Sequence, residues 1–528
     1  MIPLKFFKTF LASLGCCLVF FSCYSQISQP FRFEKERKFN DDDFTIIPLE
    51  SEGIALIREQ NKYKSGNQFW EVILLDTALQ EKASLEIEVD VQDKLIGYEY
   101  APGFVYLLFV RKEFKGEMEL VSINTRSMEV VSDEIKPELN FKVTQFLKAG
   151  ENFVFGGYVD TESAALLYLP STKHVKMIPG FFQKNVELLE MRTNLNQTFN
   201  TILIDRNNQD NQTIIFRTFD SSGNQLLETV TRIDSDMIIQ NGMSSTLRRD
   251  DMMILGTWGK RNTKQASGFY ASHVNPFGTQ NVQRVYFGQL EHYLEYLKPK
   301  KAAKVKERTA DALERGKIPD FTNYVIPFKI VEYEKGFLLL AESFVPSSTY
   351  SQNSPTPYGY YPNYYPYSPY GGYYPGNRMY PIPYQYNQGA NVSNDQDVKC
   401  IHGIVMAMDN QGKVLWDYSL KFDNVKRDAL EQSMDFILTQ QNVFLLYKKE
   451  SELIMKKITL SSGEEEEIIE KITPKNSTDE VRSENTPMGT VKQWYRNNFY
   501  VWGYQTVRNK YSADKTREVF YINKVVVP

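Results

Sequence analysis

Cysteine is nearly absent from the part of this 528-residue chain that can form a folded body. Four cysteines occur, and three of them, Cys16, Cys17 and Cys23, lie within the first 23 residues. Only Cys400 remains beyond that segment, so the folded body cannot contain an internal disulfide. A chain of this length without disulfides has to be stabilised by a large hydrophobic core. Hydrophobic residues make up 42% of the sequence, which is typical of a protein that folds.

A large excess of one charge is also missing. The formal net charge is -4, from 61 Lys and Arg against 65 Asp and Glu. Such a balance excludes a strong chain-wide field that would attract nucleic acid, and we expect no nucleic-acid partner.

Recognisable catalytic and metal-binding motifs are lacking too. The four histidines are scattered, and the pair Cys400 and His402 has no second pair at the spacing of a zinc site. No nucleophile elbow, phosphate loop or dinucleotide fingerprint occurs. We therefore assign no catalytic residue and expect neither a metal ion nor a cofactor. A catalytic pair of carboxylates from distant segments remains an open alternative, because the fold could bring them together and sequence spacing does not reveal this.

The N-terminus carries the features of an export signal. Lys5 and Lys8 precede the apolar run 9–21, which is too short to span a bilayer and is followed by small residues. We expect residues 1–25 to be removed by cleavage after Ser25, or Cys23 to take a lipid, since "FFSC" resembles a bacterial lipobox. Either route places the protein in the periplasm or at the outer membrane, with the extracellular space as the alternative. Membrane contact is expected only through a lipid anchor at Cys23.

A short apolar run recurs along the rest of the chain. Its first apolar residues, Ile54, Phe104, Phe153, Ile202 and Met252, follow one another at intervals of about 50 residues. Similar runs begin near Gly336, Asn442 and Asn498. A period of this length indicates a propeller or a solenoid.

Each apolar run is followed by a β-hairpin and preceded by a further strand, so that one unit holds about four short strands. Examples of the hairpin are "IIFRTFDSSGNQLLETV" from Ile214 and "GIVMAMDNQGKVLWDYSL" from Gly403. We predict an all-β, eight-bladed β-propeller, with seven blades as the fallback, in a single domain over residues 26–528. The last unit is one strand short, and "PFRFEKERKF" from Pro30 is predicted to supply its fourth strand and so to remove both free sheet edges.

One hairpin also resembles a known family. In "AMDNQGKVLWDYSL", Ala407 to Leu420, the order of Asp409, Gly412 and Trp416 is similar to a blade of the quinoprotein-type (PQQ-like) propellers. The resemblance covers this hairpin alone, so it implies the fold and not the cofactor. Propellers of that type include outer-membrane assembly lipoproteins that bind partners without catalysis.

Two insertions interrupt the repeat, and the propeller topology predicts that both leave from one face. The first, residues 289–317, has a helical composition and the spacing Leu290, Tyr293, Leu294, Leu297, with a break expected at Pro299. It is a solvated cap over a blade or a surface for a partner.

The second insertion, residues 346–398, is rich in Tyr and Pro. Proline disfavours helix and sheet here, while tyrosine supplies the amphipathic contact area that binding surfaces use. We consider it a partner-contacting arm, flexible sequence without a ligand, or a packed cover. The candidate contact residues are Tyr360, Tyr361, Tyr364, Tyr365, Tyr367, Tyr370, Tyr373 and Tyr374.

These features predict an exported, monomeric propeller that binds an envelope protein or a polysaccharide. A polysaccharide-acting propeller enzyme and a purely structural envelope protein are the alternatives.

Overall fold

The computed structural model describes the chain from residue 27 onward with several gaps. The first 26 residues, including Cys23 and the predicted export signal, lie outside the described residues. The described ranges are 27–38, 43–111, 116–207, 212–246, 252–261, 263, 265–278, 280–346, 371–372, 374–375, 378–379, 398–427, 431–485, 488–509, 511 and 516–528.

The chain divides into two compact units, which are described separately. The larger unit comprises Lys38–Asp435 and Thr486–Met488, and the smaller unit comprises Met1–Arg37, Phe436–Asn485 and Gly489–Pro528. Within the described residues, eight antiparallel sheets of the blade type are formed, six of them in the larger unit. The chain is therefore an all-β, eight-bladed β-propeller, and the predicted fold class is confirmed.

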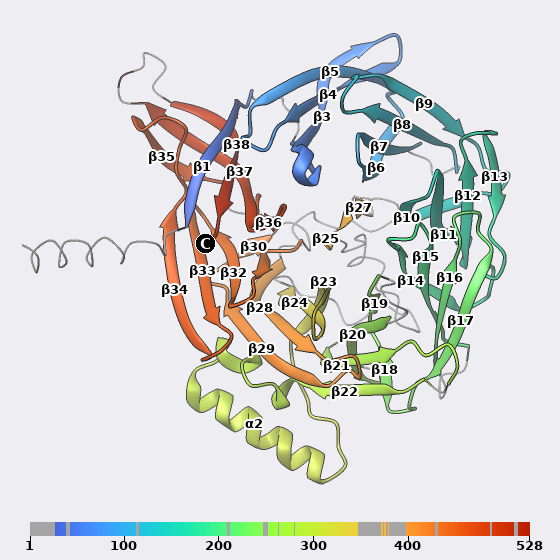
Figure 1. Ribbon diagram of the computed structural model, residues 1–528, viewed down its shortest axis with the longest axis vertical. Coiled ribbons are helices and arrows are strands. Elements are labelled where there is room, and N and C mark those ends of the chain that lie inside the picture. The colour runs from blue at the N-terminus through green and yellow to red at the C-terminus, as the bar shows by residue number, and fades with distance from the viewer. Residues whose placement is uncertain are drawn as a thin grey trace, which may run out of the picture. The chain divides into compact units, whose positions relative to one another are not determined.

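The six sheets of the larger unit follow one another in chain order (Figure 1). Their strands are β2 (Thr45–Pro48), β3 (Ile54–Lys64), β4 (Asn67–Leu75) and β5 (Glu81–Asp90); β6 (Asp93–Ala101), β7 (Phe104–Arg111), β8 (Met118–Asn124) and β9 (Val130–Ile135); β10 (Phe141–Ala149), β11 (Asn152–Val159), β12 (Glu162–Leu169) and β13 (His174–Met177); β14 (Val186–Thr193), β15 (Phe199–Asp205), β16 (Thr213–Phe219) and β17 (Gln225–Arg232); β18 (Met237–Ile239) with β19 (Met243–Ser244), β20 (Met253–Lys260), β21 (Ala266–His273) and β22 (Val282–Tyr286); and β23 (Tyr324–Tyr333), β24 (Gly336–Pro346), β28 (Val398–Met408) and β29 (Val414–Lys421), with β30 (Lys426–Arg427) beside β28. We number these sheets blades 1 to 6.

The recurring apolar run is the second strand of each blade, as the 50-residue period predicted. In β7, Val105 to Val110 are all buried, because a middle strand packs against the neighbouring blades with both of its faces. The outer strand β17 instead alternates between exposed and buried residues, which is the pattern of a strand with one face in solvent. One apolar cluster between blades 2 and 3 contains Leu108 and Phe155, each fully buried. Burial on both faces therefore explains why the second strands were the easiest elements to recognise.

Aspartate and asparagine side chains set the turns between the third and fourth strands. In blade 4, Oδ1 of Asp220 accepts hydrogen bonds from the backbone N–H groups of Ser222 (2.9 Å) and Asn224 (2.8 Å). Asp409 forms the same pair of bonds with Gln411 (3.0 Å) and Lys413 (2.9 Å) in blade 6. Such Asx turns fix the hairpin register locally. The turns are completed by Gly223 and Gly412, both with φ of 80°.

The smaller unit contains blades 7 and 8. Blade 7 is formed by β31 (Met434–Leu438), whose first two residues belong to the larger unit, β32 (Asn442–Lys449), β33 (Glu452–Thr459) and β34 (Glu464–Lys471). Blade 8 is formed by β35 (Asp479–Glu484), β36 (Val491–Gln493), β37 (Asn498–Asn509), β38 (Thr516–Val526) and β1 (Ser28–Glu36). The N-terminal strand β1 pairs antiparallel with β38, so the prediction that the start of the chain completes the last blade is confirmed.

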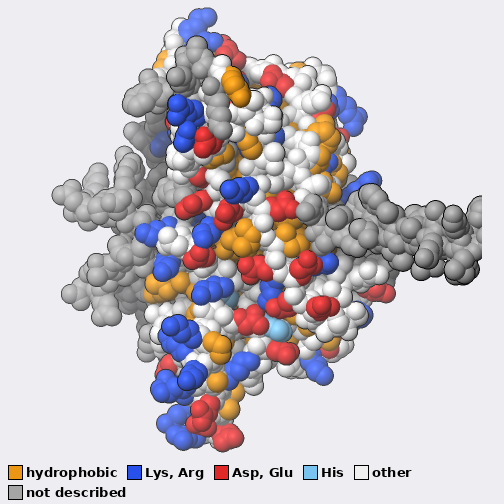
Figure 2. All heavy atoms as spheres, turned by 90° about the vertical axis from the view of Figure 1, so that its left-hand side faces the viewer, with side chains coloured by type: hydrophobic (Ala, Val, Ile, Leu, Met, Phe, Trp, Pro, Cys, Tyr) orange, Lys and Arg blue, Asp and Glu red, His pale blue; other side chains and the backbone are white. Residues whose placement is uncertain are grey.

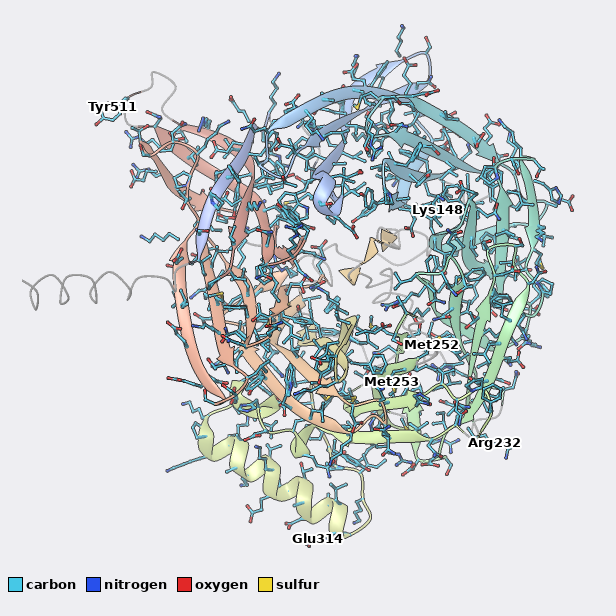
Figure 3. The ribbon with its side chains drawn as sticks, viewed as in Figure 1. Lys148, Arg232, Met252, Met253, Glu314 and Tyr511 are labelled. Carbon is cyan, nitrogen blue, oxygen red and sulfur yellow. The ribbon has the colours of Figure 1, made fainter. Side chains whose placement is uncertain are left out.

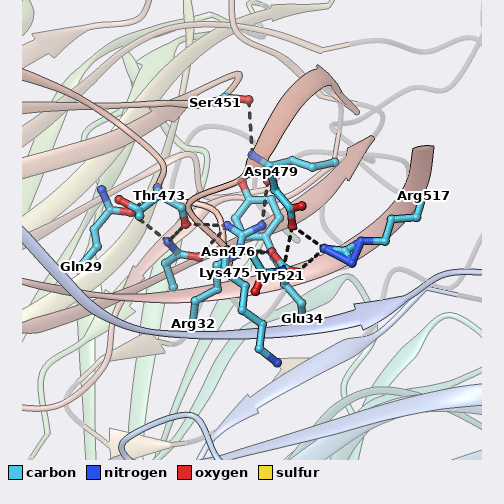
Figure 4. A network of polar contacts seen from close by, with 12 residues as sticks. Gln29, Arg32, Glu34, Ser451, Thr473, Lys475, Asn476, Asp479, Arg517 and Tyr521 are labelled. Carbon is cyan, nitrogen blue, oxygen red and sulfur yellow. Dashed lines mark hydrogen bonds and ion pairs between the residues drawn. The ribbon is translucent and has the colours of Figure 1, made fainter. Parts of the chain in front are cut away.

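A buried polar network fixes β1 in this blade (Figure 4). The Arg32 guanidinium forms an ion pair with Glu34 (2.6 Å) and donates to the side chains of Asn523 (2.9 Å) and Gln505 (2.9 Å). Its Nη1 also donates to the carbonyl oxygen of Thr473 at 3.1 Å. Both members of the ion pair are 5% exposed, so every bond of the guanidinium replaces lost hydration. The network therefore fixes the register of β1 against β38, which backbone hydrogen bonds alone would not specify.

Candidate functional site

The first insertion follows β22 and precedes β23, and its first piece is not the α-helix expected from its composition. It consists of the 3-10 turns η2 (Phe287–Gln289) and η3 (Tyr293–Tyr296), followed by the α-helix α2 (Pro299–Glu314). The predicted break at Pro299 is confirmed, since Pro299 is the first residue of α2 and the preceding Lys298 is extended. Gly316, with φ of 66°, follows the C-terminal end of the helix. We call residues 287–317 the helical insert.

The apolar stripe of the insert packs into the core between blades 5 and 6. Leu290, Tyr293 and Leu294 are at most 3% exposed and belong to the same cluster as Phe269 of β21. The ring of Tyr293 stacks on that of Phe287 with a centroid distance of 4.2 Å. The spacing of apolar residues therefore predicted the buried face correctly, although the backbone is 3-10 rather than α.

Asp417 on β29, the outermost strand of blade 6, anchors the insert. One carboxylate oxygen accepts the backbone N–H of Glu291 (2.8 Å) and the other accepts that of His292 (2.8 Å). Ser419 adds a hydroxyl bond to the carbonyl oxygen of His292 (2.7 Å). Burial raises the pKa of Asp417, and its two backbone bonds oppose that rise. These contacts satisfy backbone groups at the start of η3 that no helix satisfies.

His402 on β28 forms the second anchor. Its ring is fully buried, lies parallel to that of Tyr296 at 4.4 Å, and is perpendicular to that of Tyr293 at 4.8 Å. Neither ring nitrogen has a hydrogen-bond partner among the described residues. Burial lowers the pKa of His402 to about 3, so the imidazole is neutral at pH 7. His402 therefore acts as an aromatic core residue, and Cys400, buried on the same strand, has a thiol pKa raised to about 11 by burial.

The pKa of His292 is shifted in the opposite direction from that of His402, because His292 faces a carboxylate. Its Nδ1 lies 2.5 Å from Oε1 of Glu295, and this hydrogen bond raises the pKa of His292. Its ring also lies 5.0 Å from that of Tyr418.

The exposed side chains of α2 include more cations than anions, since Glu307, Asp311 and Glu314 are the exposed acidic residues. Lys300, Lys301, Lys304, Arg308 and Arg315 are exposed, and we call these five residues the basic row. In Figure 2, Lys and Arg side chains lie toward the bottom of the view with Asp and Glu side chains among them, and in Figure 3 Glu314 marks the C-terminal end of α2. The basic row is the strongest candidate for a binding surface in the described part of the chain.

The second insertion lies mostly outside the described residues. Seven of its eight candidate contact residues, Tyr360, Tyr361, Tyr364, Tyr365, Tyr367, Tyr370 and Tyr373, are among the residues not described, while Tyr374 lies in a two-residue strand. The described pieces are β25 (Gly371–Gly372), β26 (Tyr374–Pro375) and β27 (Arg378–Met379). β27 pairs with β6, the innermost strand of blade 2, at Tyr98 and Gly97. These pieces therefore lie at the inner edges of blades.

The two insertions leave blade 6 at the same end of its sheet, as predicted. Tyr324, where the chain returns from the helical insert, pairs with Phe344, close to the start of the Tyr/Pro segment. Of their described parts, η3 packs on the outermost strand β29, whereas β27 pairs with an innermost strand. The expectation that both leave from one face is confirmed where they begin, and whether they lie beside each other stays a prediction, because most of the second insertion lies outside the described residues.

Several other buried or half-buried charges in the larger unit are held by structural partners. Lys329 on β23 forms an ion pair with Asp435 at 3.0 Å, and both side chains are at most 3% exposed. Lys148, on the inner strand β10 (Figure 3), donates to the carbonyl oxygen of Gly150 and lies 5.7 Å from the Tyr106 ring. "DRNNQDNQ" connects β15 and β16, and Arg206 within it is paired with Glu187.

No family model and no curated protein matches the chain. Among solved structures, it is similar to the polysaccharide lyase Uly1, with 9% identity, a TM-score of 0.40, and coverage of 92% of this chain and 99% of the lyase. It is also similar to a europium-containing methanol dehydrogenase (9% identity, TM-score 0.41, 94% and 93% covered) and a Synechocystis apocarotenoid oxygenase (7%, 0.33, 94% and 94%). Among the described residues, no helix has the length and apolarity needed to cross a bilayer. Similarity this low transfers no reaction, and the fold assignment rests on the strand pairing itself.

Proposed function

We propose that this chain is an exported, non-catalytic β-propeller that binds a protein or glycan partner in the bacterial cell envelope. The observation that carries the proposal is the helical insert. Asp417 and His402 fix it to blade 6, while the basic row on its outer side stays exposed. A surface held in one geometry before binding loses little conformational entropy when a partner docks.

The buried ionisable groups also support a role in binding rather than catalysis. Lys329 and Asp435 neutralise each other, and Glu190 pairs with Arg192 (3.2 Å) while accepting the backbone N–H of Ser244 (2.5 Å). Groups committed to such partners are poor general acids or bases, because moving a proton breaks a buried pair. Burial also raises the pKa of Tyr270, which keeps its hydroxyl neutral.

A pull-down from the native envelope with tagged full-length protein tests the proposal. We expect a specific partner, and we expect its recovery to fall in the variant Lys300→Gln, Lys304→Gln, Arg308→Gln of the basic row. If the Tyr/Pro segment is a partner-contacting arm, recovery should also fall when residues 347–397 are replaced by a short polar linker between β24 and β28. The control instead removes residues 208–211, which lie in the sequence between β15 and β16 of blade 4. The absence of any soluble partner would favour a structural envelope protein, and depolymerisation of a polysaccharide by the purified chain would favour an enzyme.

Export is tested separately by fractionation. A lipid anchor predicts that Cys23→Ala moves the protein from the membrane fraction to the soluble fraction, whereas cleavage after Ser25 predicts no change. Retention of the unprocessed chain in the cytoplasm would contradict export.

A further inference from the structure

The region of α2 is far more basic than the rest of the protein. Residues 298–317 contain eight Lys and Arg against three Asp and Glu, a formal charge of +5 in a chain whose net charge is -4. The local charge therefore opposes the charge of the whole molecule, and it is concentrated on one helix.

The basic row follows the helix axis. Lys300, Lys304 and Arg308 are four residues apart, and successive members of such a series lie on the same side of a helix. Lys301 and Arg315 extend the row, which spans about 22 Å at 1.5 Å per residue. In the described part of the chain, none of the five forms an ion pair or a side-chain hydrogen bond.

This arrangement is unfavourable for the helix alone. The first turn of α2 contains no acidic residue, although the helix dipole favours anions there and disfavours Lys300 and Lys301. Like charges four residues apart, as in Lys300 and Lys304, also repel each other. Cations at the N-terminal end of the helix and like charges four residues apart both cost stability, and no contact of these side chains with the described residues compensates for that cost, which indicates a functional requirement.

The exposed side of α2 indicates which kind of anion it suits. All its exposed side chains are charged or alanine, apart from Pro299 at its first position, and its larger apolar residues, Val305 and Leu313, are partly buried. Protein interfaces usually need a large apolar or aromatic anchor and are depleted in lysine, and surface-bound membrane helices need an apolar face that inserts. A row of unpaired cations binds instead by long-range attraction and counterion release, which suits a linear polyanion.

We propose that the basic row is a docking site for a linear anionic polysaccharide that carries carboxylate or sulfate groups. This inference rests on the proposed function and names the class of its partner. The shared chemistry is a chain of anionic oxygens that neutralises Lys300, Lys304 and Arg308 together.

The test measures binding of the purified chain, without residues 1–25, to polygalacturonate, to heparin and to neutral dextran at low and at physiological salt. Binding to one or both polyanions that weakens with salt, and no binding to dextran, is expected. Preference for polygalacturonate identifies carboxylate as the ligand group, and preference for heparin identifies sulfate. The triple variant Lys300→Gln, Lys304→Gln, Arg308→Gln should lose at least about tenfold in affinity, with a shallower salt dependence.

The matched control removes the same three charges from exposed outer strands. Lys82→Gln, Lys176→Gln and Arg232→Gln lie on β5, β13 and β17, and this variant should bind as the parent does (Figure 3 labels Arg232). Gln is a good helix former, so urea unfolding should be nearly unchanged in both variants.

Equal loss in both variants would overturn the assignment to α2, as would unchanged binding in the triple variant or no polyanion binding at all. Tighter binding to duplex DNA or to anionic vesicles than to either polysaccharide would overturn the partner class. If polyanion binding fails while the envelope pull-down still recovers a partner, the proposed function stands without this inference. If neither assay finds a partner, both fall.

Discussion

The buried His402 should make the stability of the insert sensitive to acid. Its pKa is about 3 in the folded protein because the ring is buried against Tyr293 and Tyr296, whereas an exposed histidine has a pKa of about 6.5. The folded pKa is depressed, so the unfolded chain binds one more proton between these two values. The stability from a neutral His402 is therefore complete above pH 6.5 and is lost progressively as the pH falls toward 3.

The magnitude follows from the size of the shift. Each pH unit well inside this window is worth about 1.4 kcal/mol, and an unfolded histidine is only half protonated at pH 6.5, so acidification from pH 6.5 to 4.5 should cost about 2 kcal/mol. Other groups titrate in this window. The pKa of His292 is raised, and its pairing with Glu295 stabilises the folded protein at low pH and is lost as the pH rises through that raised value. A comparison between two variants removes such shared contributions.

His402→Phe isolates the effect, because phenylalanine keeps a ring in the stack but does not titrate. We expect the free energy of unfolding, from urea titrations at pH 7.0, 6.0, 5.0 and 4.5, to fall less steeply in the variant. The difference between parent and variant should grow by about 2 kcal/mol between pH 6.5 and 4.5. His174→Phe on β13 controls for the loss of a histidine as such. Parallel pH profiles for the parent and His402→Phe would refute the reasoning.

Three substitutions test the other structural contacts. Arg32→Met removes the buried guanidinium but leaves Glu34 with a second ion-pair partner, Arg517 at 3.2 Å, and should lower the free energy of unfolding by about 2 kcal/mol in urea titrations. Arg482→Met, which breaks an exposed pair with Glu480, should cost less than about 1 kcal/mol. Asp417→Asn removes one of the two carboxylate acceptors and should destabilise the start of the insert by about 1–3 kcal/mol, which should appear as faster amide hydrogen exchange at residues 291–296. The control Asp311→Asn, on the exposed side of α2, should leave this exchange unchanged. Unchanged protection of residues 291–296 from exchange in Asp417→Asn would contradict the anchoring role. Gly256→Ala places a methyl group against the carbonyl oxygen of Asn241 and should lower the urea midpoint by an amount equivalent to about 1–3 kcal/mol. The control Gly316→Asn, at an open position with positive φ, should leave the midpoint unchanged. Equal midpoints for the two variants would show that the backbone at Asn241 moves away from residue 256 at no cost.

The repeat could be predicted from the sequence because its physical cause acts within each strand. Burial on both faces makes second strands such as Ile54–Lys64 begin with a continuous apolar run, and an Asx residue with glycine marks the hairpin that follows. Closure by the N-terminal strand was predictable as well, because a missing strand at one end matched a surplus strand at the other. Local signals repeated eight times were enough to establish the fold.

The anchors of the insert could not be predicted in the same way. Asp417 lies 126 residues from Glu291, whose backbone it binds, and in the sequence it is only one polar residue of a hairpin. The sequence already argued against a zinc site at Cys400 and His402, but it did not predict that the His402 ring packs against the rings of Tyr293 and Tyr296. Lys298 is extended because it precedes proline, which is why the expected first helix ends as a 3-10 turn. Contacts of this kind depend on packing and leave no pattern along the chain.

The two insertions of blade 6 provide two surfaces that should act independently. They leave the sheet at one end, but the helical insert is held on the outermost strand β29, whereas β27 pairs with an innermost strand of blade 2. The innermost and outermost strands of a four-stranded blade are three spacings apart, about 14 Å at 4.8 Å each, and β27 lies on the inner edge of a different blade from β29. Perturbations this far apart, without shared contacts, usually add in free energy. A variant that combines the linker at 347–397 with the triple change in the basic row should therefore lose affinity by the product of the two separate factors. A much smaller loss would mean that both insertions contact the same stretch of ligand, and that the partner spans the blade from one edge to the other.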